Sequence, residues 1–393
     1  MPRPRLLTAP FLIAGLASLV HGLAIHSYLH IPGFLSGLGA REDTIGFVFS
    51  AMAGAAIAIR PVAGRLMDGV GRRVAIVGGG VLHVVACALF LTVSSIGPWL
   101  FLVRVVQGFA SGAIFSGLFT YAADIVPASR RAEGMGIFGV SGLLPVSLGG
   151  LLGDAVLAAA GWRTFFIVTA GLALLGLLVS LALREPPRLR ASAGDGRGFL
   201  RALTQPDLVP IWFVGSSFAC GLTAVFAFMR TFVESPDGVG TVGFFFTWYS
   251  LSAIAVRIGL GWVPDRMGLK RVFFPSMGLV GLSLLTVAAA HDHLVLALAA
   301  VIAGIGHGYA FPILSALTVN RAEPAHRGSA VGLFTAIFDA GVLVGGPLLG
   351  TVARTTDLRT MYVVAALIPW AGAAVFWAWD REATRAPTRA GAR

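Results

Sequence analysis

Residues 64–73 read Gly-Arg-Leu-Met-Asp-Gly-Val-Gly-Arg-Arg, and a related stretch at 261–271, offset by 197 positions, reads Gly-Trp-Val-Pro-Asp-Arg-Met-Gly-Leu-Lys-Arg. With the same offset, Arg60 matches Arg257. Each copy lies between apolar stretches that are long enough to cross a bilayer. The repeat predicts a membrane protein that consists of two related halves.

The composition excludes an ordinary water-soluble protein. Of 393 residues, 56% are hydrophobic and only 12% are charged, whereas soluble domains carry about 25% charged residues. Stretches such as 77–93 are apolar on all sides, which excludes the alternating pattern of barrel strands. Spans of about 20 apolar residues are predicted at 6–29, 44–64, 74–95, 98–123, 134–160, 164–183, 208–232, 240–262, 272–290, 294–319, 329–353 and 359–379.

We therefore predict an all-α polytopic membrane protein with twelve transmembrane helices in two pseudo-symmetric six-helix bundles. The first span begins close to two arginines, as a signal peptide does, but it is too long for one and is expected to be retained. A polar segment with Pro and Gly separates the halves. The predicted parts are a first bundle at 1–184, a cytoplasmic linker at 185–207, a second bundle at 208–380 and a cytoplasmic tail at 381–393.

The basic residues predict the orientation. With the amino terminus inside, the inner segments hold 21 Lys or Arg and the outer segments hold five, and such residues concentrate in cytoplasmic loops. Both termini are therefore expected in the cytoplasm, with the chain in the cytoplasmic membrane. The same loops explain the net charge of +11 through the anionic inner leaflet, so lipid is an expected partner and nucleic acid is not. Cys87 and Cys220 lie inside spans and are expected to be packing residues.

The loop at 64–73 resembles the signature of the major facilitator superfamily, Gly-x-Leu-x-Asp-Arg-x-Gly-Arg-Arg/Lys, although Gly69 replaces the usual first Arg. The resemblance implies transport by alternating access between two lobes, with no cofactor, and we expect a monomer. It also implies a conformational latch, in which Asp124 is the acidic partner of the first loop. The alternative is a solvated turn that only sets orientation. The latch residues are Gly64, Asp68, Gly71, Arg72, Arg73 and Asp124, with Gly261, Asp265, Arg266, Gly268 and Lys270 in the second copy.

The sequence indicates no use of ATP. A phosphate-binding loop needs Gly-Lys-Ser/Thr, and the single lysine, Lys270, precedes Arg271. The expected driving force is an ion gradient, with protons as the simplest coupling ion, or the gradient of the small-molecule substrate itself.

Ionisable residues within spans are costly in lipid and are therefore candidates for function. Asp339 and His307 lie at similar depth on adjacent spans and are predicted to form a proton-coupling pair, with a structural hydrogen bond as the alternative. Arg104 and Asp154, on spans 4 and 5, are predicted to neutralise one another. Arg104 with Gln107 also resembles the family's Arg-x-x-Gln-Gly motif, which implies proton transfer in exporters.

Two further arginines, Arg60 and Arg257, lie within two turns of the predicted inner loops, where we expect them to snorkel or to brace the signature loops. Aromatic and polar side chains within spans suggest an apolar cavity for an amphipathic organic solute, although aromatic residues can equally face lipid. We expect no metal site, because no thiolate or carboxylate cluster joins the histidines of span 1. The predicted cavity residues are His21, His26, Gln107, Phe226, Trp248 and Tyr249.

The direction of transport stays open at the level of sequence. Drug/proton antiporters of the family carry Gly-x-x-x-Gly-Pro-x-x-Gly-Gly in span 5, but here the glycine before Pro145 is missing, and the clearer version surrounds Pro347 in span 11. We favour proton-coupled efflux. Proton-coupled uptake is the closest alternative, and a sensor or membrane enzyme on the same scaffold is a weaker one, because no nucleophile or zinc motif is present.

Overall fold

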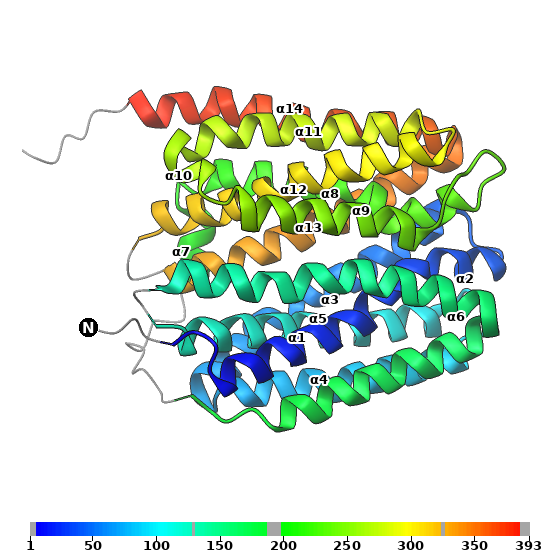
Figure 1. Cartoon of the computed structure of the whole chain (residues 1–393), viewed down its shortest axis with the longest axis horizontal. Coiled ribbons are helices and arrows are strands. Elements are labelled where there is room, and N and C mark those ends of the chain that lie inside the picture. Colours follow the sequence, from blue (N-terminus) through cyan, green and yellow to red (C-terminus); the bar gives the residue numbers. More distant parts are fainter. Residues whose placement is uncertain (1–4, 128–129, 187–197, 324–326, 386–393) are drawn as a thin grey trace, which may run out of the picture.

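A computed structural model describes residues 5–127, 130–186, 198–323 and 327–385, and it is a bundle of long helices that lie side by side (Figure 1). Within these residues, eleven helices are long and apolar enough to cross a membrane. One of them, α6, contains two of the predicted spans, so the twelve-helix architecture expected from the sequence is confirmed.

The first lobe contains six spanning segments, and its first span continues beyond the predicted end at residue 29. Pro32 lies in the first turn of α2, where its missing N–H removes no helical hydrogen bond. The elements are α1 (Ala9–Ser27), η1 (Tyr28–His30), α2 (Ile31–Gly37), α3 (Glu42–Gly69), α4 (Arg72–Leu89), η2 (Phe90–Thr92), α5 (Pro98–Ile125) and α6 (Arg131–Leu181).

Helix α6 reverses direction at Gly161, whose φ of 69° falls in the left-handed region that favours glycine. The arms on either side of this glycine correspond to the spans predicted at 134–160 and 164–183. Figure 1 shows the two arms running in opposite directions along the bundle.

The second lobe contains the remaining spans. Polar caps begin two of its helices: Thr241 accepts a hydrogen bond from the Phe244 N–H, and Asp292 accepts one from the Val295 N–H. The elements are α7 (Gly198–Thr204), α8 (Val209–Val233), α9 (Val242–Gly259), α10 (Val263–Met267), α11 (Leu269–Ala288), α12 (His293–Arg321), α13 (Arg327–Thr355) and α14 (Leu358–Arg385).

The lobes meet along a seam made by α3 with α13 and by α6 with α9. Glycines allow the closest approach. A Cβ atom on Gly46 would collide with the carbonyl oxygen of Gly346, and one on Gly150 would lie 3.0 Å from the Cα of Gly243. Such small-residue contacts are how helices pack tightly in lipid, where no hydrophobic force drives them together.

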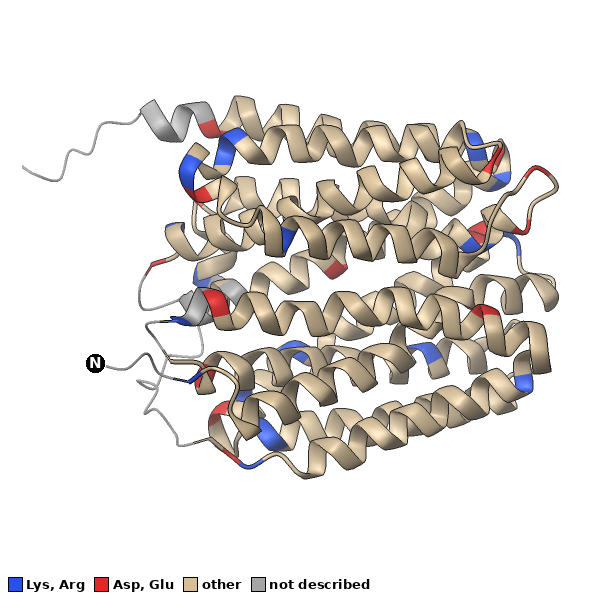
Figure 2. Ribbon diagram, viewed as in Figure 1, with Lys and Arg blue, Asp and Glu red and all other residues tan. Residues whose placement is uncertain are grey.

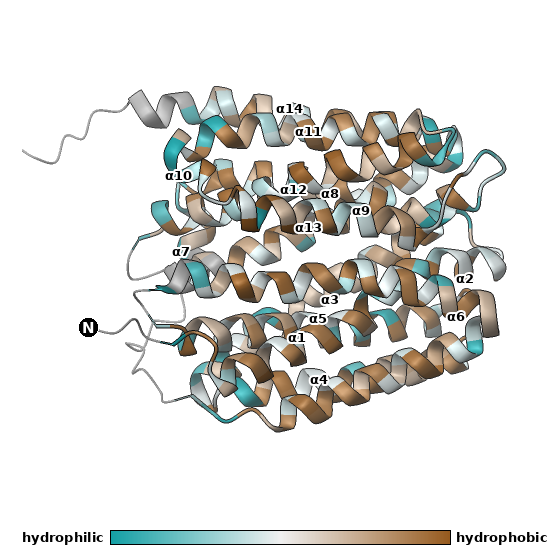
Figure 3. Ribbon diagram, viewed as in Figure 1, coloured by the Kyte–Doolittle hydropathy of each residue, from teal (hydrophilic) through white to brown (hydrophobic). Residues whose placement is uncertain are grey.

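Charged residues gather at the two ends of the bundle, and few lie between them (Figure 2). Apolar residues cover the middle of the helices (Figure 3). We call the end that carries the first helix start and the 64–73 loop the basic end, and the other the distal end. The predicted linker at 185–207 and tail at 381–393 lie partly outside the described residues, at 187–197 and 386–393, so the proposed domain boundaries stay predictions.

Candidate functional site

An ion pair joins the two lobes near the middle of the seam. Arg60 on α3 donates from Nη2 to Asp339 Oδ2 on α13 over 2.5 Å, and from Nη1 to Thr335 Oγ1 over 2.5 Å. Ser116 on α5 accepts a third hydrogen bond at 3.3 Å. The side chains of Arg60 and Asp339 are 10% and 27% exposed, so the ion pair is largely buried at membrane depth.

The sequence predicts that Arg60 snorkels toward the signature loop or braces it. The structure shows Arg60 in the seam instead. Side chains of a helix point toward its amino terminus, and α3 enters the bundle from the distal end. This direction carries the guanidinium group away from the basic end, toward the middle of the seam.

The predicted pairing of His307 with Asp339 is wrong. His307 on α12 hydrogen-bonds through Nδ1 to the hydroxyl of Tyr249 on α9. The two candidates were placed at similar depth, but helix rotation turns His307 toward α9, whereas Asp339 faces α3. Their roles in proton coupling stay predictions.

The predicted neutralisation of Arg104 by Asp154 is also wrong. Arg104 is 1% exposed and donates to the Val48 carbonyl at 3.2 Å and to Gln107 Oε1 at 2.6 Å. Its guanidinium carbon lies 5.0 Å from the ring centre of Phe49. Gln107 is fully buried and serves as a partner of Arg104, so it does not line a cavity.

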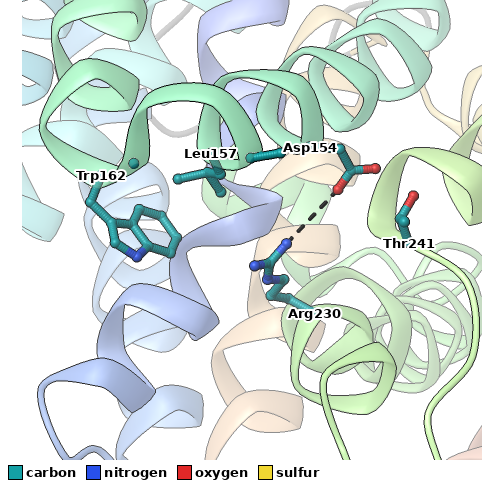
Figure 4. Close-up of a pocket in the computed structure, with 7 residues that line it drawn as sticks. Asp154, Leu157, Trp162, Arg230 and Thr241 are labelled. Atoms are coloured by element: carbon teal, nitrogen blue, oxygen red, sulfur yellow. Dashed lines mark ion pairs between the residues drawn. The ribbon is translucent and has the colours of Figure 1, made fainter.

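Asp154 instead closes the seam at the distal end. Its Oδ2 accepts a hydrogen bond from the N–H of Gly243 on α9, and its Oδ1 lies 2.8 Å from His30 Nε2 and 3.8 Å from Arg230 Nη1 on α8. Figure 4 shows Asp154 and Arg230 facing each other beside Trp162 and Thr241. These residues line a pocket of about 440 Å³.

Both ring nitrogens of His30 lie beside oxygen atoms that accept hydrogen bonds. The imidazole is fully buried, and its Nδ1 lies 3.1 Å from the carbonyl oxygen of Ser27, which only accepts. Its Nε2 lies 2.8 Å from a carboxylate oxygen of Asp154.

Several predicted cavity residues lie elsewhere. His21 is buried inside the first lobe, 3.1 Å from His83 Nδ1 and 3.2 Å from Ser180 Oγ. His26 turns back to the carbonyl of Gly22 at 2.8 Å. Trp248 is 44% exposed and shares the exposed stripe of α9 with Leu251 and Ile258, so it faces lipid. Sequence gives composition, but it does not specify which side of a helix faces the partner lobe.

The remaining two aromatic candidates pack inside the second lobe. Tyr249 is fully buried, and Phe226 is half-buried with its ring centre 5.9 Å from that of Tyr249. Both rings also pack against Phe246 on α9.

The first signature loop has the contacts that the resemblance implied. Arg72 donates from Nε to Asp124 Oδ2 at 2.9 Å, and its Nη1 lies 3.4 Å from Asp68 Oδ1. Gly71 has a φ of 137°, which favours glycine. Glu185 accepts hydrogen bonds from the backbone N–H groups of Arg72 and Arg73, a partner that sequence reasoning missed. The latch role itself stays a prediction.

The second loop uses a different acid. Lys270 and Arg321 both pair with Asp380 on α14, at 2.5 and 2.9 Å. Asp380 is 3% exposed and was not a candidate, because it lies at the predicted end of the last span. Gly268 has a φ of 93°, and the Arg266 guanidinium carbon lies 4.6 Å from the ring centre of Trp262.

Comparisons with known proteins fit this architecture. A family profile described as Major Facilitator Superfamily matches residues 11–239 and 237–393. The chain belongs to the major facilitator superfamily. It is a multi-pass membrane transporter rather than an enzyme.

The superfamily relatives differ in what their names say they carry. "Multidrug resistance protein 1" of Bacillus subtilis is 24% identical, over 90% of this chain and 91% of its own length. A "Putative proline/betaine transporter" of Staphylococcus haemolyticus is 28% identical, and the match spans 62% of this chain and 57% of that protein. A crystal structure of a mutant nucleoside transporter NupG has a TM-score of 0.78 at 18% identity, covering 94% of this chain and 99% of its own. That similarity shows the fold.

Proposed function

We propose that this superfamily member exports a small organic solute across the cytoplasmic membrane by proton-coupled alternating access. The observation that carries the proposal is the Arg60–Asp339 ion pair. Protonation of Asp339 in this contact would weaken the attraction between the lobes near the middle of the seam. Resemblance of the Arg104 and Gln107 motif to that of exporters, and the multidrug resistance relative, support the export direction.

The distribution of Lys and Arg supports a cytoplasmic location for the basic end, and hence for both termini. In that orientation, the distal end faces outward. Contacts between the lobes are dense there: Asp154 reaches Gly243, and Arg354 on α13 pairs with Asp43 on α3 at 2.7 Å. The described conformation is accordingly closed to the outside.

The coupling step follows from the chemistry of the ion pair. Binding of a proton to Asp339 removes the charge that holds Arg60, which weakens the attraction between α3 and α13. While the lobes are open toward the outside, the ion pair is apart and Asp339 takes its proton from that side. When the lobes close again, Arg60 favours the ionised carboxylate and the proton leaves toward the cytoplasm. One proton thus moves inward for each outward-directed cycle.

Export is tested with everted membrane vesicles, whose interior corresponds to the outside of the cell. An inward-acid gradient should drive labelled solutes from a diverse panel into these vesicles, and a protonophore should abolish that uptake. Accumulation only in right-side-out vesicles would instead support the alternative of proton-coupled uptake.

A further inference from the structure

Arg257 is the pseudo-symmetric counterpart of Arg60, but it has no acidic partner. Its Nε donates to the carbonyl of Gly308 on α12 over a long 3.4 Å. Across the described parts of the chain, no carboxylate lies within ion-pair distance of its guanidinium group. An uncompensated charge at membrane depth is expensive and indicates a function.

The missing partner can be traced to one position. The offset that relates Arg60 to Arg257 relates Asp339 to Gly142 on α6. Both halves thus keep the arginine, but only Arg60 has an acid at the matching position. Nothing lies within 4 Å of a Cβ atom built on Gly142, and a Cβ on Gly139, one turn away, would lie 3.5 Å from Arg257 Nη1. The guanidinium group therefore lies against the first lobe at Gly139, across the seam, and a side chain at position 142 would meet no steric obstacle.

Snorkelling does not explain this arrangement. Helix α9 runs from the distal end to the basic end, and its side chains point back toward its amino terminus. Arg257 accordingly extends inward to Gly308, which lies thirteen residues, or roughly 20 Å, before the end of α12 at Arg321. It interacts electrostatically with Tyr249 and His307, two turns deeper in the lobe.

An aromatic cluster surrounds His307, which interacts electrostatically with Arg257. The ring centres of Phe218, Tyr249 and Phe311 lie 5.4, 5.6 and 6.0 Å from that of His307. Phe338, next to Asp339 in sequence, extends the cluster with its ring centre 5.3 Å from that of Phe218. Phe218 and Tyr249 are fully buried, whereas Phe311 and Phe338 are half-buried and keep part of their rings exposed. Such rings in the same lobe as an unpaired guanidinium group match a ligand with an aromatic body and a carboxylate, because arginine binds carboxylates through two parallel hydrogen bonds.

We propose that Arg257 is the substrate-anchoring residue of this transporter, and that the substrate is an aromatic organic anion whose carboxylate takes the place that Asp339 takes beside Arg60. The inference that Arg257 anchors a transported substrate rests on the proposed transport function. Anion binding at Arg257 is nevertheless independent of export or proton coupling, because it can be measured at equilibrium without a gradient.

The experiment measures ligand-induced shifts in Tm and ligand Kd on the purified full chain in detergent. The probes are benzoate, salicylate and 1-naphthoate, each compared with its uncharged amide and with benzylamine as the cation. The expected result is that at least one carboxylate binds and stabilises the protein, whereas the amides and benzylamine bind about tenfold or more weakly.

Two sets of variants locate the site. Arg257→Gln should raise the carboxylate Kd about tenfold or more, with partial recovery in Arg257→Lys. Gly142→Asp installs the missing acid and should displace the carboxylates from Arg257 while leaving the protein folded, because the position is open. Gly142→Asn has the same size without the charge and should retain binding.

Stronger binding of benzylamine than of every carboxylate, or undiminished carboxylate binding in both Arg257→Gln and Gly142→Asp, would overturn the inference. Carboxylate binding that obeys these expectations, together with no proton-dependent flux in vesicles, would leave the anion site standing and defeat the proposed function. Proton-driven transport confined to cationic solutes would support the proposed transport function and overturn the anion site at Arg257.

Discussion

Replacing Asp339 with Asn removes one negative charge and keeps the size of the side chain. The change leaves Arg60, whose side chain is 10% exposed, without its anion, while the hydrogen bonds to Thr335 and Ser116 persist. Because the pair joins α3 to α13, the loss acts on the contact between the lobes and not on either lobe alone.

The size of the effect follows from burial. Removing one partner of a fully buried ion pair costs 3–5 kcal/mol. The Asp339 side chain is 27% exposed, so the pair is not fully buried and we expect a smaller cost of about 1 to 3 kcal/mol here. At about 1.4 kcal/mol for each factor of ten, the conformation closed at the distal end becomes about 5- to 140-fold less populated relative to the open one.

The assay compares two activities of one protein in proteoliposomes. Transport driven by a pH gradient should be lost in Asp339→Asn, because the site that binds the proton is gone. Exchange of labelled for unlabelled solute without a gradient should persist, because it needs only the rocking of the lobes. The double variant Arg60→Gln, Asp339→Asn should regain the lost stability, since no unpaired charge remains, but should not regain coupling.

Undiminished transport of the Asp339→Asn variant under a pH gradient would refute the reasoning and remove this residue from proton coupling. Equal loss of gradient-driven transport and of exchange, with the variant correctly folded, would assign Asp339 to the conformational cycle itself instead.

The remaining predictions concern the seam and the basic end. Asp154→Asn should weaken the distal closure, seen as a longer distance between spin labels placed across the distal seam; an unchanged distance distribution would contradict the assigned contact. Gly46→Ala should impair packing or transport because its Cβ would collide with the Gly346 carbonyl, whereas Gly54→Ala, whose Cβ would meet only Leu343 at 3.5 Å, should be tolerated; equal behaviour of the two in a thermal melt would argue against the tight seam. Asp380→Asn should destabilise the protein by about 3 kcal/mol because two cations lose one buried acid, and a denaturation midpoint equal to that of the native protein would show that this cluster contributes nothing.

Much of the architecture could be predicted because it depends on local properties of the chain. A transmembrane span is a run of apolar residues that is stable in lipid. Each of the twelve spans could therefore be predicted without reference to neighbouring segments. The reversal at Gly161 and the tight turns at Gly71 and Gly268 also depend on one or two residues. The contact of Arg72 with Asp124 could be anticipated only through resemblance to a family.

The partners of the buried charges could not be predicted in this way. Depth along a helix follows from counting residues, and it placed His307 near Asp339 and Arg104 near Asp154. Rotation about the helix axis and the choice of neighbouring helix decide which groups meet, and both depend on packing between segments far apart in the chain. His30 and Arg230, which sequence reasoning did not assign to Asp154, are 124 and 76 residues away from it.

The sequence by itself determined the solvent, the number of spans, the duplication and the concentration of basic residues at one end, because hydrophobicity and charge act on each segment separately. Only the tertiary structure decided that Arg60 meets Asp339 while Arg257 meets no acid. Duplication preserved both cations, and a glycine at position 142 left one of them unpaired; that asymmetry becomes visible only when α6 and α9 are placed against each other across the seam.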